Sequence, residues 1–230
     1  MNTVECHRAN GVLRWVAYFD LLGTSVLLET GRVSEVCSAY DMAVKKLKTW
    51  KKRYPSVTPV WFSDTFLLYT KDESAESFKA IEMLARWFVF WLIYKRVPVR
   101  GALAHGEFYA DARERIYLGY ALLDAYHCGE NQDWLGFVLT QSAIDRLSAL
   151  GLSVEKMRDY RYYAVPIKHR TRESPRSQAA CIVGNWFRSE GHTNRLLSKL
   201  QMMEAKQTKP KIRRKYKRTI KFLRQYEGQL

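Results

Sequence analysis

The segment Val12-Leu-Arg-Trp-Val-Ala-Tyr-Phe-Asp-Leu-Leu-Gly-Thr-Ser25 sets the start of the predicted fold. Its first eight residues are mostly apolar, β-branched or aromatic, which is typical of a buried strand. The residues from Asp20 onward combine an acid, a glycine and two hydroxyls, which predicts a turn. We therefore expect Asp20 to stand at the end of a buried strand.

A β-hairpin is predicted within Val60–Tyr69, where two short apolar runs flank Ser63 and Asp64. A helix is predicted before it, over Val33–Trp50, because apolar residues recur there at helical spacing with lysines on the other face. The elements expected after the hairpin are an unusually aromatic helix over Glu73–Lys95 and a strand over Val97–Tyr109.

This order of strand, helix, hairpin, helix and strand is the ferredoxin-like βαββαβ arrangement of an α+β fold. A helical crossover leaves the first two strands pointing the same way. The hairpin then returns the third strand antiparallel beside the first. The end of the first strand and the tip of the hairpin meet at one edge of the sheet, so we expect Asp20 and Asp64 to lie there together.

The C-terminal half predicts further elements and a division of the chain. We expect a catalytic domain over residues 1–186, ending in a strand pair, and a basic helical extension over residues 187–230. The elements expected beyond residue 110 are helices over Leu118–Gly129, Gln141–Leu150, Arg188–Lys206 and Ile212–Tyr226, and strands over Leu135–Thr140, Tyr160–Lys168 and Ala179–Trp186.

Composition and charge exclude several classes of protein. The chain has 230 residues, 47% of them hydrophobic, which allows a sizeable core and excludes global disorder. Of the net charge of +15, the segment Lys206–Leu230 contributes +9. The body is only mildly basic, as expected of a domain that handles a small anion rather than coating DNA. Nucleic acid is therefore not expected as a partner, except through this tail.

Cysteine usage and hydropathy indicate a cytoplasmic protein. The longest apolar run, Met83–Tyr94, is interrupted by Arg86 and is shorter than the roughly 20 residues of a membrane span. The polar N-terminus predicts no signal peptide. Reduced thiols are favoured over a disulfide scaffold or a zinc site, because the four cysteines are far apart and form no CxxC pair: Cys6, Cys37, Cys128 and Cys181.

Two carboxylates at one sheet edge predict a cation. They repel each other unless a cation lies between them or one is protonated. Carboxylate oxygens suit Mg²⁺ or Mn²⁺, and two such ions roughly 3.5–4 Å apart can activate an attacking oxygen and stabilise a leaving pyrophosphate. The turn after Asp20 offers main-chain N–H groups to a triphosphate. The alternative is that Asp20 is a helix cap and Asp64 a turn residue.

Four segments resemble, in order and spacing, the catalytic domain of class III nucleotide cyclases. They are similar to the first metal motif, the hairpin with the second metal aspartate, the strand after the second helix and the glycine-led helix of that family. The segments are Tyr18–Ser25, Trp61–Phe66, Val99–Glu107 and Leu118–Tyr126. The resemblance covers about Val12 to Ala149, and in its compact form the chain is most similar to the pyrimidine cyclases of bacterial antiphage signalling.

The resemblance implies a site with two Mg²⁺ or Mn²⁺ ions. Asp20 and Asp64 would hold both ions, and the main-chain carbonyl of Leu21 would complete the shell of the second. The ions would lower the pKa of the ribose 3′-hydroxyl for in-line attack on the α-phosphorus. The resemblance also implies a homodimer with shared sites. The residues it places along the triphosphate are Phe19, Gly23 and Thr24.

Two features depart from the pattern of the family. The Asn and Arg that many cyclases carry on the glycine-led helix would fall near Leu123 or Asp124 and near His127, and neither place matches. The residue that specifies a purine would fall near Val60, whose apolar side chain does not support an ATP or GTP cyclase. Either another residue replaces the missing pair in substrate binding or catalysis is slow. The candidates for the replacement are Arg100, Arg113, Arg115 and Lys168.

We therefore expect a metal-dependent pyrimidine nucleotide cyclase that converts UTP, or else CTP, to the 3′,5′-cyclic monophosphate in antiphage defence. The alternatives are a purine cyclase of the same fold and an inactive module that binds nucleotide or RNA. The tail could bind nucleic acid or an anionic membrane, or form a helix lying on the body. Tyr120 and Tyr126 could contact a base or pack at a dimer interface, and His105 could accept a proton or be an interior histidine.

Overall fold

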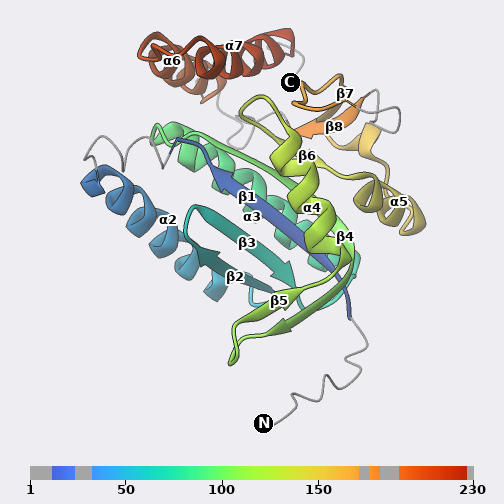
Figure 1. The fold of residues 1–230 in the computed structure, drawn as a ribbon. Coiled ribbons are helices and arrows are strands. Elements are labelled where there is room, and N and C mark those ends of the chain that lie inside the picture. Colours follow the sequence, from blue (N-terminus) through green and yellow to red (C-terminus); the bar gives the residue numbers. More distant parts are fainter. Residues whose placement is uncertain (1–11, 24–32, 171–176, 182–191, 227–230) are drawn as a thin grey trace.

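The computed structural model describes residues 12–23, 33–170, 177–181 and 192–226. A mixed sheet runs through it in the order β2-β3-β1-β4-β6-β8-β7, and β5 pairs with β4 outside this row (Figure 1). The strands are β1 (Val12–Leu21), β2 (Val57–Phe62), β3 (Thr65–Thr70), β4 (Val99–Asp111), β5 (Ile116–Leu118), β6 (Phe137–Leu139), β7 (Tyr160–Tyr163) and β8 (Gln178–Cys181). The helices are α2 (Val33–Arg53), α3 (Ala75–Tyr94), α4 (Tyr120–Asn131), α5 (Gln141–Ala149), the 3-10 turn η1 (Val154–Lys156), α6 (His192–Ala205) and α7 (Pro210–Gln225).

The predicted βαββαβ core is confirmed. Strand β1 lies between β3 and β4 and is antiparallel to both, while β2 pairs antiparallel with the outer side of β3. Strands β1 and β2 therefore point the same way. The hairpin between β2 and β3 has a two-residue loop, because Phe62 pairs with Thr65. Ser63 takes a left-handed φ of 52°, the backbone that such a tight turn needs.

Several boundaries differ from those that the sequence predicts. Strand β1 continues through Asp20 to Leu21, because Asp20 is paired on both sides, with Thr65 and with Arg100. The short strand β5, which the sequence analysis missed, forms an arm with the end of β4. The predicted C-terminal strand pair is confirmed as β7 and β8, and its last residues beyond Cys181 lie outside the described residues.

The two faces of the sheet are covered by different helices (Figure 1). The odd-numbered residues of β1 from Trp15 to Leu21 are buried in the main core, where Phe19 packs on Phe88 of α3. The even-numbered residues Val16 and Tyr18 belong to two smaller clusters with α4. Since side chains alternate along a strand, Asp20 lies on the α4 face.

Small residues let α4 lie close to the sheet. Ala121, Ala125 and Gly129, spaced four apart on one side of the helix, are buried. A Cβ atom on Gly129 would lie 2.8 Å from Cδ1 of Tyr18, and one on Gly101 would lie 2.4 Å from the carbonyl oxygen of Tyr18. The C-terminal end of α4 is thereby held against β1 and β4, next to Asp20.

The basic C-terminal helix α7 packs on the body of the protein. Tyr216, Phe222 and Leu223 are buried in the main core. The Thr219 hydroxyl accepts a hydrogen bond from the main-chain N–H of Leu135 and donates one to its carbonyl, each at 2.9 Å. These contacts fix the helix beside the start of β6.

The sequence also predicts the absence of a membrane span and the presence of reduced thiols. None of the helices in the described ranges combines the length and the apolar character that a membrane crossing requires. The described cysteines, Cys37, Cys128 and Cys181, are free thiols.

We expect Gly101→Ala to lower the free energy of unfolding by about 2 kcal/mol, because the new methyl group would overlap main-chain atoms that cannot move aside cheaply. Urea denaturation measures the change. Gly129→Ala is the comparison: its methyl group would overlap the ring of Tyr18 rather than the main chain, and the helix gains about 1 kcal/mol of propensity, so the loss should be smaller. An unchanged midpoint for Gly101→Ala would contradict the close packing.

Candidate active site

The topology brings Asp20 and Asp64 to one edge of the sheet. The main-chain N–H of Leu21 donates to the carbonyl oxygen of Asp64 at 3.0 Å, so the two segments are hydrogen-bonded neighbours. The charges of both acids act on Tyr40 of α2. Burial raises the pKa of its hydroxyl to about 12, and the charges of Asp64 and Asp20 add to this rise. The Asp20 carboxylate of β1 and the Asp64 carboxylate of the β2–β3 turn thus both lie near Tyr40.

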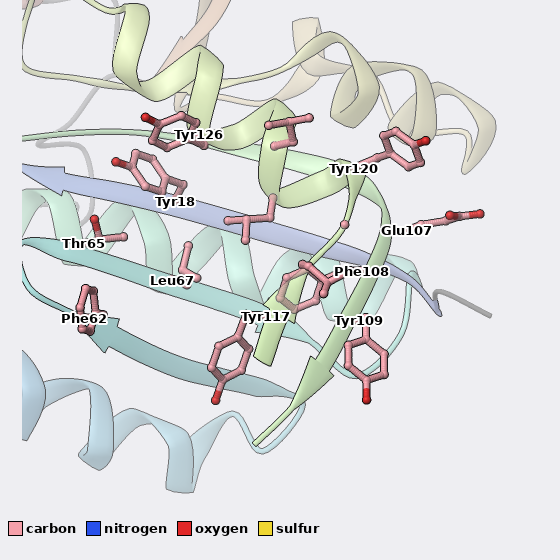
Figure 2. A pocket seen from close by; sticks show the side chains of 14 residues that line it. Tyr18, Phe62, Thr65, Leu67, Glu107, Phe108, Tyr109, Tyr117, Tyr120 and Tyr126 are labelled. Atoms are coloured by element: carbon pink, nitrogen blue, oxygen red, sulfur yellow. The ribbon is translucent and has the colours of Figure 1, made fainter. Parts of the chain in front are cut away.

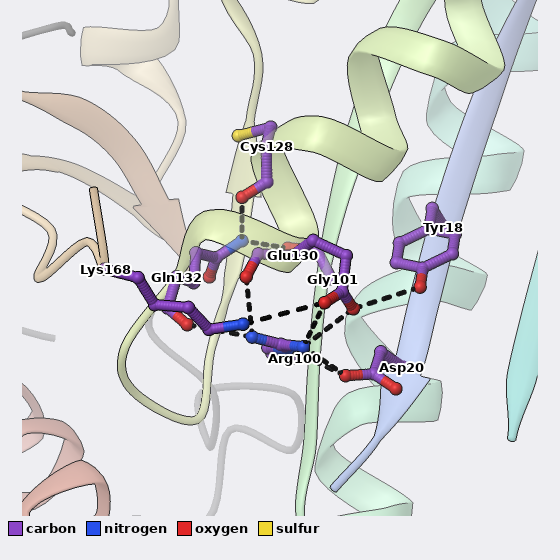
Figure 3. A network of polar contacts seen from close by, with 8 residues as sticks. All are labelled: Tyr18, Asp20, Arg100, Gly101, Cys128, Glu130, Gln132 and Lys168. Atoms are coloured by element: carbon purple, nitrogen blue, oxygen red, sulfur yellow. Dashed lines mark hydrogen bonds and ion pairs between the residues drawn. The ribbon is translucent and has the colours of Figure 1, made fainter. Parts of the chain in front are cut away.

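A buried arginine holds the Asp20 carboxylate. Arg100 lies opposite Asp20 on β4, and both side chains are on the α4 face. Nε of Arg100 donates to Oδ2 of Asp20 at 2.8 Å, and Nη2 lies 2.6 Å from the same oxygen (Figure 3). Nη1 donates to the main-chain carbonyls of Glu130 at 2.7 Å and Gln132 at 3.1 Å. Arg100 is 4% exposed, so nearly all its donors are used inside the protein.

Glu130, at the end of α4, completes this network. Its two carboxylate oxygens lie 2.7 and 2.6 Å from Nη2 of Arg100. The Tyr18 hydroxyl donates to Glu130 at 3.2 Å, and Nζ of Lys168 lies 3.6 Å from it (Figure 3). Burial opposes the charge, but Arg100 and Lys168 hold the pKa of Glu130 below its usual value.

The Asp20 carboxylate is the less well compensated of the two acids. Burial raises its pKa to about 6, against the opposing pull of Arg100 and with a smaller rise from the charge of Glu130. A carboxylate in this state gains from a further positive charge. A cation in addition to Arg100 would therefore stabilise the ionised form of Asp20.

The donor set fits a hard divalent cation. Asp20 and Asp64 supply carboxylate oxygens, and Leu21 supplies a main-chain carbonyl at the same edge. Within the described ranges, no group of three or more His, Cys, Asp or Glu side chains could hold an ion by itself. Mg²⁺ commonly binds through one or two carboxylates together with water and substrate phosphates, so these residues suit Mg²⁺ or Mn²⁺.

The predicted phosphate-binding segment is described in part. The side chain of Phe19 is fully buried and stacks on Phe137, so only its main chain lies near the edge. Gly23 has a left-handed φ of 82°, which favours glycine in the turn after β1. Thr24 lies outside the described residues.

The candidate replacements for the missing Asn and Arg are not all near Asp20. Arg100 and Lys168 are in the network, whereas Arg113 and Arg115 are exposed in the turn between β4 and β5, at the far end of β4.

The α4 residues at the places of the missing Asn and Arg have other surroundings. Asp124 accepts a hydrogen bond from the Ser142 hydroxyl at 2.6 Å, and Leu123 and His127 are exposed. His105 is engaged elsewhere: its Nε2 lies 2.8 Å from Glu73, and its ring contacts Trp15.

A hollow of about 800 Å³ lies beside α4, between the β2–β3 hairpin and the β4–β5 arm (Figure 2). Its lining is largely aromatic and aliphatic. Phe62 at the hairpin tip is 82% exposed and Tyr120 on α4 is 74% exposed. The lining residues are Tyr18, Phe62, Thr65, Leu67, Glu107, Phe108, Tyr109, Tyr117, Leu118, Gly119, Tyr120, Leu122, Leu123 and Tyr126.

The sequence analysis missed Glu130. An acid in the last turn of a helix interacts unfavourably with the helix dipole. The position of Glu130 in the last turn of α4 is therefore the one local sign that another group stabilises its charge. Its partner Arg100 lies 30 residues away in the chain, so no spacing rule connects them.

Comparisons with known proteins place the fold. No protein-family model and no curated protein matches the sequence. Among solved structures, the catalytic core of a rhodopsin-guanylyl cyclase in complex with ATPαS matches with a TM-score of 0.56 and 11% identity, over 74% of this chain and 96% of that one. An adenylate cyclase of Trypanosoma brucei in its monomeric state gives 0.52 and 13%, over 73% and 87%. An adenylyl cyclase of P. aeruginosa gives 0.53 and 10%, over 73% and 91%.

These matches define the class by fold. The chain has the mixed α+β fold of class III nucleotide cyclase catalytic domains, with Asp20 and Asp64 at one edge of its sheet.

We expect Glu130→Gln to lower the free energy of unfolding by about 2 kcal/mol, because Arg100 loses a two-oxygen, charged partner in a buried place. Chemical denaturation measures it. Glu107→Gln makes the same change at an exposed position of β4 and should stay within about 0.5 kcal/mol of the unsubstituted protein. Equal effects in both variants would show that the network does not stabilise the fold.

Proposed function

We propose that this protein is a metal-dependent nucleotide cyclase whose substrate is a pyrimidine nucleoside triphosphate, UTP before CTP. Its products would be the 3′,5′-cyclic monophosphate and pyrophosphate, and the cyclic nucleotide would act as a second messenger in antiphage defence. The observation behind the cyclase assignment is the pair Asp20 and Asp64, brought to one sheet edge on a cyclase fold.

The pyrimidine assignment is supported by the resemblance and by Val60. This residue pairs with Leu67 on β3 and packs with the apolar residues of the α4 face. An apolar side chain at that place offers no hydrogen bond to the edge of a purine. The choice of UTP over CTP comes from the family resemblance.

In this proposal, Asp20 and Asp64 hold Mg²⁺ or Mn²⁺, with the Leu21 carbonyl as a further ligand. When bound, two such ions lower the pKa of the ribose 3′-hydroxyl and offset the charge of the leaving pyrophosphate. Arg100 keeps the Asp20 carboxylate oriented at the edge of the sheet. Lys168, beside Glu130, lies where it can contribute positive charge toward the phosphates.

A homodimer is part of the proposal. Exposed apolar side chains surround the hollow on three elements, and such a patch is typical of an interaction surface. One of the places where many cyclases carry the Asn, Leu123 on α4, lines this hollow. A second copy seated there would cover the patch and share the site. The exposed apolar residues that line the hollow are Phe62, Leu118, Tyr120, Leu123 and Tyr126.

We expect Asp20→Asn and Asp64→Asn each to reduce turnover of UTP by at least about a thousandfold, because a lost metal ligand removes several kcal/mol of transition-state stabilisation. The assay incubates purified protein with Mn²⁺ and each of four ribonucleoside triphosphates, and resolves the products by mass spectrometry. Mn²⁺ should also raise the thermal midpoint of the unsubstituted protein and not that of either variant.

The control for these variants is Asp41→Asn, an exposed acid of α2, which should leave turnover and the Mn²⁺ effect unchanged. Cyclic AMP or cyclic GMP as the product would keep the cyclase and overturn the pyrimidine assignment. Near-normal turnover in either Asn variant would refute the metal assignment.

We expect light scattering to give about twice the chain mass of 27.0 kDa. Leu123→Glu, which places a charge in the apolar patch, should shift the protein to the monomer and abolish turnover, with the fold unchanged by circular dichroism. Glu114→Gln on the exposed turn of the arm should do neither. A fully active monomer would exclude a shared site.

A further inference from the structure

Helix α7 reaches the same turn that Arg100 holds. This turn, residues 130–133, comprises the last residues of α4 and the start of its connection to β6. Arg100 binds it through the carbonyls of Glu130 and Gln132. Arg218 of α7 forms an ion pair with Asp133, and Arg214 lies 3.6 Å from the same carboxylate.

The loop that carries Lys168 is tied to the turn as well. The main-chain N–H of Lys168 donates to the carbonyl of Asn131 at 2.7 Å. The main-chain N–H of Asp133 donates to the carbonyl of Pro166 at 2.8 Å. Three separate parts of the chain, namely β4, the Lys168 loop and α7, therefore converge on residues 130–133, which Arg100 joins to Asp20.

Positive charge exceeds negative charge at this convergence. Its basic groups are Arg100, Lys168, Arg214, Lys215 and Arg218, and its acids are Asp20, Glu130 and Asp133. Each acid already has a basic partner. Lys215 is half-buried, and its ammonium has no hydrogen bond or ion pair with any described residue. Burial, with Arg100 and Lys168 nearby, lowers the pKa of Lys215.

A half-buried lysine placed among other cations reduces stability unless an anion joins it. We propose that Lys215, together with Lys168, forms an anion site beside Asp20 that binds the polyphosphate chain of the substrate. The anion site follows from the charges alone, and its assignment to a nucleoside triphosphate rests on the proposed function. In this proposal the C-terminal helix is part of the site.

Isothermal titration of the full chain with inorganic tripolyphosphate tests the proposal. Lys215→Gln should weaken binding about tenfold, since a charged contact to phosphate is lost. Lys215→Arg should retain most of the affinity. The thermal midpoint of Lys215→Gln should equal or exceed that of the unsubstituted protein, because the removed ammonium has no hydrogen bond or ion pair with the described residues.

The matched control is Lys217→Gln, the same loss of charge two residues further along α7 at an exposed position. It should change the affinity by less than about twofold. Equal losses in both variants would mean diffuse attraction to a basic helix and would overturn the proposal. So would unaltered binding in Lys215→Gln, no binding by the unsubstituted protein, or a lowered midpoint in Lys215→Gln, which would make Lys215 structural.

Cyclase assays separate this proposal from the proposed function. If the protein is active, Lys215→Gln should raise KM for the triphosphate more than it lowers kcat. If tripolyphosphate binding depends on Lys215 but no triphosphate is cyclised, the anion site stands and the cyclase assignment fails. If the protein is active and Lys215→Gln has an unaltered KM and affinity, the anion site fails and the cyclase assignment stands.

Discussion

The buried guanidinium of Arg100 is the interaction on which the arrangement of this edge depends. A charge that is removed from water must be paired and hydrogen-bonded, or the fold loses several kcal/mol. Arg100 meets that demand by binding Asp20 across the sheet, Glu130 at the end of α4 and two carbonyls of the following turn. One side chain thereby links β1, β4, the end of α4 and the segment that leads to β6. The small residues of α4 permit this, since only a close helix brings Glu130 within reach.

The same network orients the candidate catalytic carboxylate of Asp20, while burial destabilises its negative charge. Asp20 is held in position by Arg100, yet burial keeps its pKa near 6, so the acid is oriented without being fully neutralised. This combination suits a ligand for a divalent ion, which must be rigid and still able to accept more positive charge. On the other side of the network, burial together with the charges of Arg100 and Lys168 lowers the pKa of the Lys215 ammonium. Both features reduce stability at one place, as is typical of functional sites.

The apolar face beside α4 has a different character from this charged edge. Its aromatic residues come from the hairpin, the arm and the outer side of α4, and several are largely exposed. The sheet that positions Asp20 and Asp64 also supports this face, because Tyr18 belongs to both: its hydroxyl donates to Glu130 and its ring lines the hollow. A partner bound at the hollow would therefore contact the charged network through Tyr18. This link gives a physical reason why assembly and catalysis would be coupled.

The sequence by itself determined the order of elements and the edge at which Asp20 and Asp64 meet. Both follow from local periodicity, from the two-residue turn at Ser63 and from the chain direction that a crossover and a hairpin impose. Only the tertiary structure decided the partners of those acids. Arg100 is 80 residues from Asp20 and Arg218 is 85 from Asp133, so these contacts depend on register and helix packing rather than on spacing. The arm strand β5 was missed for the same reason: three residues carry too little pattern, and its pairing with the end of β4 defines it. These long-range ion pairs form because the assembled sheet and helices place residues that are distant in sequence beside each other. Once they are buried there, unlike charges must pair.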